Sequence, residues 1–138
     1  MTDVNDWNTQ IIQEFRENNG NVGGNFEGAP MVLLNTTGAK TGKSRTNPLV
    51  ALVDNDRVFI FASKAGAPTN PDWYHNIIAN PRVTVEQGTE RYEAEASVVQ
   101  GAERDRLFGI QKERMPGFAD YEAGTDRVIP VIELRRVA

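Results

Sequence analysis

The sequence predicts an α+β fold, a small closed or partly closed antiparallel β-barrel with helices packed outside it. Its expected elements run in the order helix, three strands, helix, two strands, helix, strand. Short turns join neighbouring strands and no strand–helix–strand unit repeats, so a barrel fits better than a doubly wound parallel sheet. The length of 138 residues is typical of one domain, which spans residues 1–138.

The N-terminal region predicts one amphipathic helix followed by irregular chain. Asn5 or Asp6 can cap the helix, and Gly20 can end it. Apolar side chains recur at spacings of three and four over residues 7–15, which predicts one apolar face. Residues 20–28 are rich in glycine, and we expect there either a mobile loop over a neighbouring pocket or a plain linker.

Three apolar runs then predict strands at residues 31–34, 49–53 and 58–62. Residues 54–56 can turn the chain between the second and third runs, which favours antiparallel pairing. Asp72 can cap a short helix that ends at Asn80-Pro81, because proline disfavours helical geometry in the residue before it. The remaining expected elements are a hairpin at residues 83–87 and 91–99, a helix at residues 102–115 and a last strand at residues 128–134.

Composition and charge argue against several classes of function. The net charge of -4 does not suit a nucleic-acid-binding protein, which needs a broad basic face. Cysteine is absent and His75 is the only histidine, so we expect no metal site and no Ser–His–Asp triad. No apolar run approaches the ~18 residues of a spanning helix, and the N-terminus lacks a signal-peptide pattern. We therefore expect a cytoplasmic protein with no stable membrane insertion.

The most informative segment is a basic loop at residues 36–48. No Asp or Glu occurs at residues 28–53, so Lys40, Lys43 and Arg45 form an uncompensated positive site in an acidic chain. Consecutive backbone N–H groups in a glycine turn can form an anion nest beside such cations. The segment therefore predicts an anion site, with a solvated hairpin turn as the alternative.

This loop matches the phosphate loop of nucleotide hydrolases only in part. Thr37 stands where that motif requires its first glycine, and a strand-like run containing Pro48 follows where the motif requires a helix. Three charge-assisted contacts at ~1.5–3 kcal/mol each can anchor a phosphate or carboxylate tail without giving tight binding. A second, apolar pocket must therefore hold the rest of the ligand.

A second cluster of interest follows the third expected strand. Residues 62–68 are mostly small, and Trp73 and Tyr74 come shortly after them. Small residues let a flat ring approach the backbone, and aromatic side chains can form its walls, although both aromatics could instead belong to the core. Because the chain has no thiol, metal set or triad, any redox chemistry requires an organic cofactor. The sequence thus predicts a planar ligand with an anionic tail.

Four ordered motifs at compatible spacings extend over nearly the whole chain. They are Leu33–Leu49, then Ala62–Pro68, then Asn70–Asn76 with Ala79–Pro81, and finally Thr125–Arg127 with Ile129–Val131. In these motifs the chain resembles the deazaflavin (coenzyme F-420)-dependent nitroreductase and quinone reductase family. The resemblance implies a split antiparallel β-barrel that binds coenzyme F-420, an 8-hydroxy-5-deazaflavin with a phospholactyl oligoglutamate tail. It implies an oxidoreductase that transfers a hydride from the reduced coenzyme to a quinone, a nitro compound or an activated enone.

The resemblance also assigns residues to the two parts of the coenzyme. Those expected to hold the phosphate and glutamates are Lys40, Thr41, Gly42, Lys43, Ser44 and Arg45. Those expected to line the ring are Pro48, Ala62, Ser63, Lys64 and Trp73. This assignment matches the ligand that the residues predict on their own.

Ser63 and Tyr121 are the expected catalytic residues. The Ser63 hydroxyl would contact the ring or acceptor near the hydride path, unless it merely ends a strand. Tyr121 would donate a proton or hydrogen bond to the reduced acceptor. A nitroimidazole-activating relative has tyrosines at the positions of Met115 and Phe118, so the substrate wall of Met115, Phe118 and Tyr121 is more apolar here. We expect a large apolar acceptor such as a quinone.

Two alternatives keep the same fold. One is an FMN-binding split-barrel flavoprotein, and the other is a non-enzymatic protein that carries the coenzyme. The oligomeric state is either a monomer or a homodimer.

Overall fold

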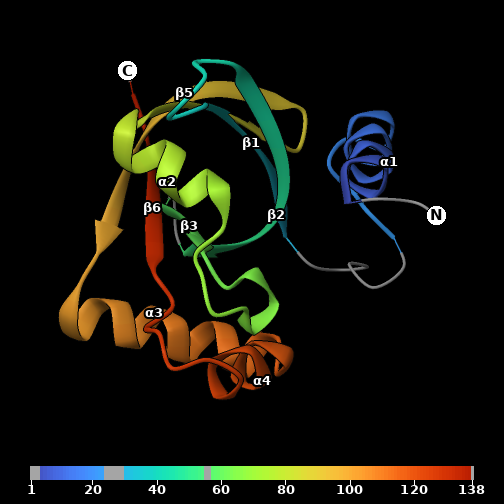
Figure 1. The fold of residues 1–138 in the computed structure, drawn as a ribbon. Helices are drawn as coiled ribbons and strands as arrows, with labels where there is room; N and C mark the ends of the chain where they lie inside the picture. The colour runs from blue at the N-terminus through green and yellow to red at the C-terminus, as the bar shows by residue number, and fades with distance from the viewer. Residues whose placement is uncertain (1–3, 24–29, 55–56, 138) are drawn as a thin grey trace.

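The computed structural model describes residues 4–23, 30–54 and 57–137, and within them six strands form a closed antiparallel barrel in the order β1-β2-β3-β6-β5-β4 (Figure 1). The strands are β1 (Met31–Thr37), β2 (Ser44–Asp54), β3 (Arg57–Phe61), β4 (Arg82–Gln87), β5 (Glu90–Val99) and β6 (Val131–Arg136). The helices are α1 (Val4–Glu17), α2 (Asp72–Ala79), α3 (Gly101–Arg114), α4 (Gly117–Ala123) and the short 3-10 helix η2 (Lys64–Gly66). The predicted α+β barrel with outer helices is confirmed.

The main difference from the predicted elements is the length of the first two strands. Thr36 and Thr37 pair with Arg45 and Ser44, so β1 and β2 extend well into the segment expected to be a loop. The basic loop is thereby reduced to residues 38–43. The residues added to these two strands are mostly polar, so the apolar pattern alone did not reveal that they pair across the hairpin.

Smaller differences occur at the ends of other elements. Helix α1 begins at Val4, so the expected caps Asn5 and Asp6 lie within its first turn. Strand β6 begins three residues later than predicted, and α4, at seven residues, is too short to show a helical period. The expected turn residues Asn55 and Asp56, and residues 24–28 of the glycine-rich stretch, lie outside the described residues.

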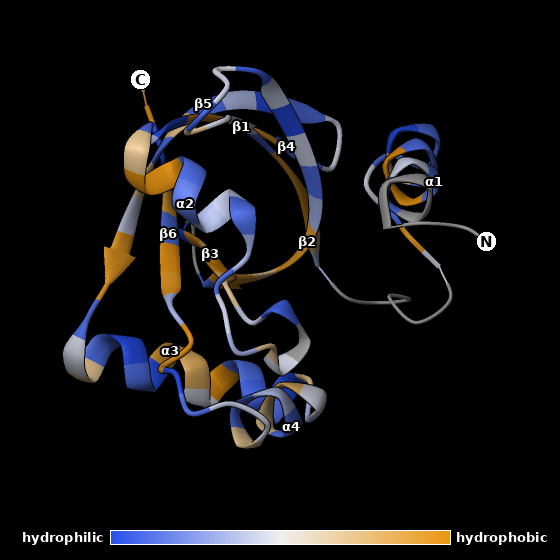
Figure 2. Cartoon of the chain, viewed as in Figure 1, coloured by the Kyte–Doolittle hydropathy of each residue, from blue (hydrophilic) through white to orange (hydrophobic). Residues whose placement is uncertain are grey.

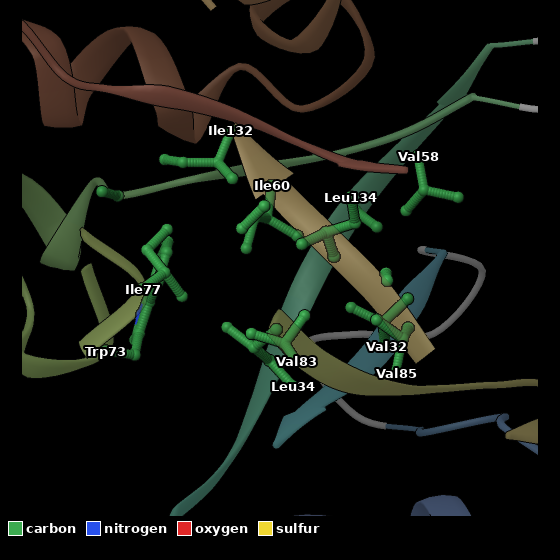
Figure 3. Close-up of a cluster of buried hydrophobic side chains, with 14 residues drawn as sticks. Val32, Leu34, Val58, Ile60, Trp73, Ile77, Val83, Val85, Ile132 and Leu134 are labelled. Carbon is green, nitrogen blue, oxygen red and sulfur yellow. The ribbon is translucent and has the colours of Figure 1, made fainter. Parts of the chain in front are cut away.

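Alternation along the strands divides the apolar side chains between two cores. In β3, Val58 and Ile60 belong to the cluster inside the barrel, while Phe59 and Phe61 pack with α3 and α4. Figure 2 shows apolar residues concentrated on the barrel strands, and Figure 3 shows the interior cluster itself. The sheet thus has a fully covered inner face and a partly covered outer face.

The helices have distinct partners. Trp73 and Ile77 of α2 join the interior cluster and lie beside the strand side chains in Figure 3, so α2 covers the barrel core. Phe15 of α1 packs outside the barrel against Met31 and Leu33 of β1. No helix in the described ranges has both the length and the apolar character needed to cross a bilayer.

Candidate functional site

The predicted tail loop and the predicted ring segment lie along one helix, α2. The segment at residues 62–70 follows β3 and leads directly into the first turn of α2. The loop at residues 38–43 contacts Asn76 of α2 through the Ala39 N–H, and Asn80, which directly follows α2, contacts the neighbouring Thr37. Eight helical residues rise by about 12 Å. The structure therefore places the two predicted parts of the site beside the same short helix, an arrangement that suits an elongated ligand.

The tail loop is a closed turn. The Gly38 N–H donates to the Lys43 carbonyl at 2.8 Å, and the Gly42 N–H donates to the Gly38 carbonyl at 3.0 Å. Gly42 has a φ of 70°, in the left-handed region that glycine adopts without a steric penalty. The side chains of Lys40, Thr41 and Lys43 are exposed on this turn. The loop is therefore shaped before any ligand arrives.

Asn76 of α2 anchors the tail loop. Its Oδ1 accepts a hydrogen bond from the Ala39 N–H at 2.9 Å, and its Nδ2 donates to Thr36 Oγ1 at 3.3 Å. Asn76 is buried, whereas the partly exposed Asn80 adds only a 3.4 Å contact from its Nδ2 to the Thr37 carbonyl. Asn76 falls in one of the four family motifs, but the sequence indicated no role for it. A polar residue on the buried face of a short helix is the signal that could have identified it.

Electrostatic pairing separates the site from the rest of the surface. Nine of the fifteen Lys and Arg side chains form ion pairs with described carboxylates. The side chains with no such pair in the described part of the chain are Lys40, Lys43, Arg45, Lys64, Arg114 and Arg127. Apart from Arg114, all of these lie in, beside or against the two segments of the site. The positive charge of Lys40, Lys43, Arg45 and Lys64 is thus available to an anionic ligand.

The backbone of the ring segment has the form of an anion nest. Ser63 has a right-handed conformation, with φ of −76° and ψ of −38°, and Lys64 follows with a positive φ of 46°. Alternation of right- and left-handed residues turns successive N–H groups toward one concavity. Among the described residues, none accepts a hydrogen bond from the N–H of Ser63 or Lys64. These two donors are therefore free to bind a ligand.

Arg127 lies in the loop between α4 and β6, and its guanidinium forms hydrogen bonds with the ring segment. Its Nη1 donates to the Ala62 carbonyl and to Asn70 Oδ1, both at 2.8 Å. Its Nη2 donates to the Ser63 carbonyl at 2.6 Å, and its Nε donates to the Ala67 carbonyl at 2.9 Å. Burial lowers the pKa of the Arg127 guanidinium, which nevertheless stays charged. Arg127 falls in one of the four family motifs, but the sequence indicated no role for it.

The residues predicted to line the ring have different environments. Ser63 is 9% exposed and forms no hydrogen bond with a described residue through its hydroxyl. Because no buried side-chain oxygen of the described residues lacks a partner, Ser63 Oγ reaches solvent. Lys64 Nζ donates to Thr69 Oγ1 at 3.4 Å, and Pro48 of β2 is partly buried opposite Leu33. The predicted ring contacts of Ser63, Lys64 and Pro48 are compatible with these positions.

Trp73 belongs to the interior cluster. Its indole is 5% exposed and packs with Ile77 and the strand side chains. Trp73 therefore packs as a core residue, which was the alternative to a ring contact. A ligand ring could touch only its small exposed part. Its contact with the ring stays a prediction.

The predicted substrate wall is built on α4 and lies against the ring segment. A Cβ added to Gly66, which has a φ of 81°, would lie 2.8 Å from the Tyr121 carbonyl oxygen, so glycine permits this close approach. Phe118 is buried and its ring packs edge-on against Tyr121 at 5.2 Å between centroids. Met115 and Tyr121 are partly exposed, and Gln111 Nε2 lies 3.5 Å from Met115 Sδ. Phe118 thus supports Tyr121 from the core side.

A cavity of about 990 Å³ lies elsewhere, between α1 and the barrel. Gly20 and Gly23 line it, so the described part of the glycine-rich stretch borders this cavity. None of the predicted site residues lines it, and Glu14 and Glu17 do. Two carboxylates at its wall disfavour an anionic ligand, so we place the candidate site along α2.

Comparison with known proteins gives consistent matches. A family model described as F420H(2)-dependent quinone reductase matches residues 7–135. An F420H(2)-dependent quinone reductase of Mycobacterium tuberculosis (strain ATCC 25618 / H37Rv) is 42% identical over 126 residues, which cover 88% of this chain and 85% of the relative. A solved structure described as an F420-H2 dependent reductase matches with a TM-score of 0.70 and 40% identity, over 77% of this chain and 94% of that one. Another, described as a domain-swapped dimer, matches with a TM-score of 0.72 and 36% identity, over 96% of this chain and 100% of that one.

Proposed function

The chain belongs to the F420H(2)-dependent quinone reductase family, and on that premise we propose that it reduces a quinone with the reduced deazaflavin coenzyme F-420. Membership confirms the family that the motifs predicted, the oxidoreductase class and coenzyme F-420 as the cofactor. The specific acceptor is the proposal. Nitro compounds and activated enones are further acceptors within it, less favoured by the apolar wall.

One observation carries the proposal: five of the six Lys and Arg side chains that have no ion pair with a described carboxylate lie in, beside or against the two segments next to α2. Lys40, Lys43 and Arg45 lie in or beside the loop that Asn76 of α2 contacts, and the free N–H groups of Ser63 and Lys64 lie in the segment that leads into α2. A ligand with a multiply charged tail and a planar head with electronegative atoms satisfies both donor sets at once. The donor chemistry of the chain therefore fits coenzyme F-420.

Each part of the site has a proposed task. Lys40, Lys43 and Arg45 bind the phosphate and glutamate groups, and the N–H groups of Ser63 and Lys64 bind polar atoms of the ring. The bound coenzyme supplies the hydride. Reduction of a quinone to a hydroquinone takes one hydride and one proton, and we assign delivery of the proton or a hydrogen bond to the Tyr121 hydroxyl. Met115 and the Phe118–Tyr121 pair keep the acceptor side apolar, which limits the access of water.

The direct test is a titration followed by a turnover assay. Oxidised coenzyme F-420 is titrated into the protein, and the reduced coenzyme is then mixed with protein and a quinone while its oxidation is followed. We expect saturable binding and oxidation of the coenzyme that requires both protein and quinone. Absence of the quinone-dependent oxidation, with or without binding, would reject the proposal.

The titration and turnover assay, together with two further measurements, separate the alternatives. Tight coenzyme binding without quinone-dependent oxidation would identify a carrier. A yellow pigment with the spectrum of FMN, copurified from a host that makes both cofactors, would identify a flavoprotein. A monomer and a homodimer are distinguished by light scattering after gel filtration, and a cytoplasmic location is part of the proposal.

A further inference from the structure

We propose that Arg127 is a positioning residue that aims the backbone N–H groups of Ser63 and Lys64 at the coenzyme ring, an inference that rests on the proposed function. The four hydrogen bonds of its guanidinium reach three carbonyls and one side-chain amide of residues 62–70. Five donors in a rigid fork make arginine able to bridge such a set of acceptors. Lysine, with all its donors on one nitrogen, cannot span them.

Peptide geometry explains how these contacts orient backbone N–H groups toward a ligand. The described peptide bonds are trans, so the carbonyl of one residue and the N–H of the next point in opposite directions. Arg127 binds the carbonyls of Ala62 and Ser63. The N–H groups of Ser63 and Lys64, which belong to the same two peptide units, therefore point away from the guanidinium. They are the two donors that have no partner among the described residues.

The conformation of the segment shows why it needs such a clamp. Lys64 has a positive φ of 46°, which is unfavourable for a residue with a side chain. Within the described residues, only two short-range backbone hydrogen bonds stabilise η2 itself. The Gly66 N–H donates to the Ser63 carbonyl, and the Ala67 N–H donates to the Lys64 carbonyl. The contacts of Arg127 come from more than fifty residues away in sequence and fix both ends of the segment.

Arg127 also ties the ring segment to the acceptor wall. It follows α4 in the chain, and α4 packs on Gly66 through the backbone of Tyr121. One side chain thus fixes the backbone proposed to bind the ring relative to the helix that carries the proposed proton donor.

The test compares Arg127→Ala and Arg127→Lys with Arg104→Ala as the matched control. Arg104 also donates to a backbone carbonyl, that of Ile129, from its Nε and Nη2 at 3.2 and 2.9 Å, but it does not contact residues 62–70. Three readouts are needed: hydrogen exchange of residues 62–70 without coenzyme, KM and kcat for the reduced coenzyme with a quinone, and the melting temperature.

We expect faster exchange of residues 62–70 in both Arg127 variants and a fall in kcat/KM of about 10²-fold, because small misplacements of binding groups have effects of this size. The fall should appear mainly as a raised coenzyme KM, and millimolar guanidinium should partly restore Arg127→Ala. Arg104→Ala should lower the melting temperature without either effect. Full activity in Arg127→Lys would show that charge alone matters and would overturn the proposal.

The exchange readout keeps this inference separate from the proposed function. If the unmodified protein does not bind coenzyme F-420, the proposed function fails. Faster exchange confined to residues 62–70 would still support the clamp. Unchanged exchange in Arg127→Ala would refute it, whatever the activity.

Discussion

The loop at residues 38–43 and the segment at residues 62–70 meet the same helix but are held in different ways. The loop is closed by its own backbone hydrogen bonds, and Asn76 fastens it through one backbone N–H and one hydroxyl. The ring segment depends on the distant Arg127, which binds its carbonyls, and on the close approach of α4 at Gly66.

The comparison shows how the two regions divide their functions. The tail loop offers long, exposed and flexible cations, which can follow a flexible chain of charges. The ring segment offers rigid backbone donors, which suit a planar group whose reacting atom must be placed accurately. Substitutions of the loop cations should therefore alter coenzyme affinity with little effect on stability, and substitutions around the segment should alter stability and kcat/KM together.

Removing the loop cations should have the largest effect on binding. The variant Lys40→Ala/Lys43→Ala/Arg45→Ala is expected to weaken coenzyme affinity by about 3–4 kcal/mol, or roughly 10²–10³-fold. The coenzyme affinity of this variant should also depend less on salt concentration, because the attraction that is removed is electrostatic. Calorimetric titration at low and high salt measures both effects.

The control for that variant removes equal charge elsewhere, at Arg82, Arg91 and Arg135, which pair with carboxylates outside the site. Affinity should stay close to that of the unmodified protein. An equal loss of affinity in both variants would mean that net charge, and not the loop, attracts the coenzyme.

Two glycines, one in each region, provide the next comparison. Gly66→Ala places a Cβ 2.8 Å from the Tyr121 carbonyl oxygen at a φ of 81°, so we expect a loss of about 2–4 kcal/mol in the free energy of unfolding. Gly42→Ala meets a φ of 70° with no described atom within 4 Å, so only strain of about 1 kcal/mol is expected. Denaturant unfolding measures both. Equal losses would contradict the close packing of α4 on the ring segment.

Asn76→Ala tests the fastening of the loop. It leaves the Ala39 N–H without its partner and removes the hydrogen bond to Thr36, for an expected loss of about 1–3 kcal/mol of stability. Coenzyme affinity should also fall, because the loop loses its anchor. Asn80→Ala, which removes one 3.4 Å contact, is the control and should cost less. A variant at Asn76 with unchanged affinity would show that the loop keeps its shape unaided.

The smallest effect should come from pH and should involve neither region, because residues 38–43 and 62–70 contain no carboxylate. The hydrogen bond from Arg16 lowers the pKa of Glu86 below its usual 4.5, against the opposing effect of burial. Its contribution to stability is therefore present above pH 4.5 and lost as pH falls through the lowered pKa. Because Arg16 is half exposed, we expect less than about 1 kcal/mol. Acid titration of the unfolding free energy should show this loss in the unmodified protein and a smaller one in Glu86→Gln.

Sequence patterns predicted most of the fold because apolar alternation and turn residues are local. Val58 and Ile60 alternate with Phe59 and Phe61, and the structure places them on opposite faces of β3. The extension of β1 and β2 to Thr37 and Ser44 was missed because it depends on cross-strand pairing of polar residues. Helix α4 was missed because its seven residues show no period.

The sequence indicated the two segments of the candidate site but not the residues that hold them in place. The loop cations could be identified because no acid lies near them in sequence. The contacts of Asn76 and Arg127 join residues about forty and sixty positions apart, and no local pattern encodes such a pairing. Trp73 shows a different limit of local patterns. Its sequence position did not decide between a ring contact and the core, and the structure packs it in the barrel core.

The position of α2 has a thermodynamic consequence. This helix inserts Trp73 and Ile77 among the barrel side chains and, through Asn76, holds the surface turn that recognises anions. Occupancy of that turn is thereby linked to the melting of the whole cooperative unit. Even a fragment that reproduces only the acidic end of the coenzyme should protect the protein against heat and proteolysis, and that protection should extend to buried amides far from the point of contact.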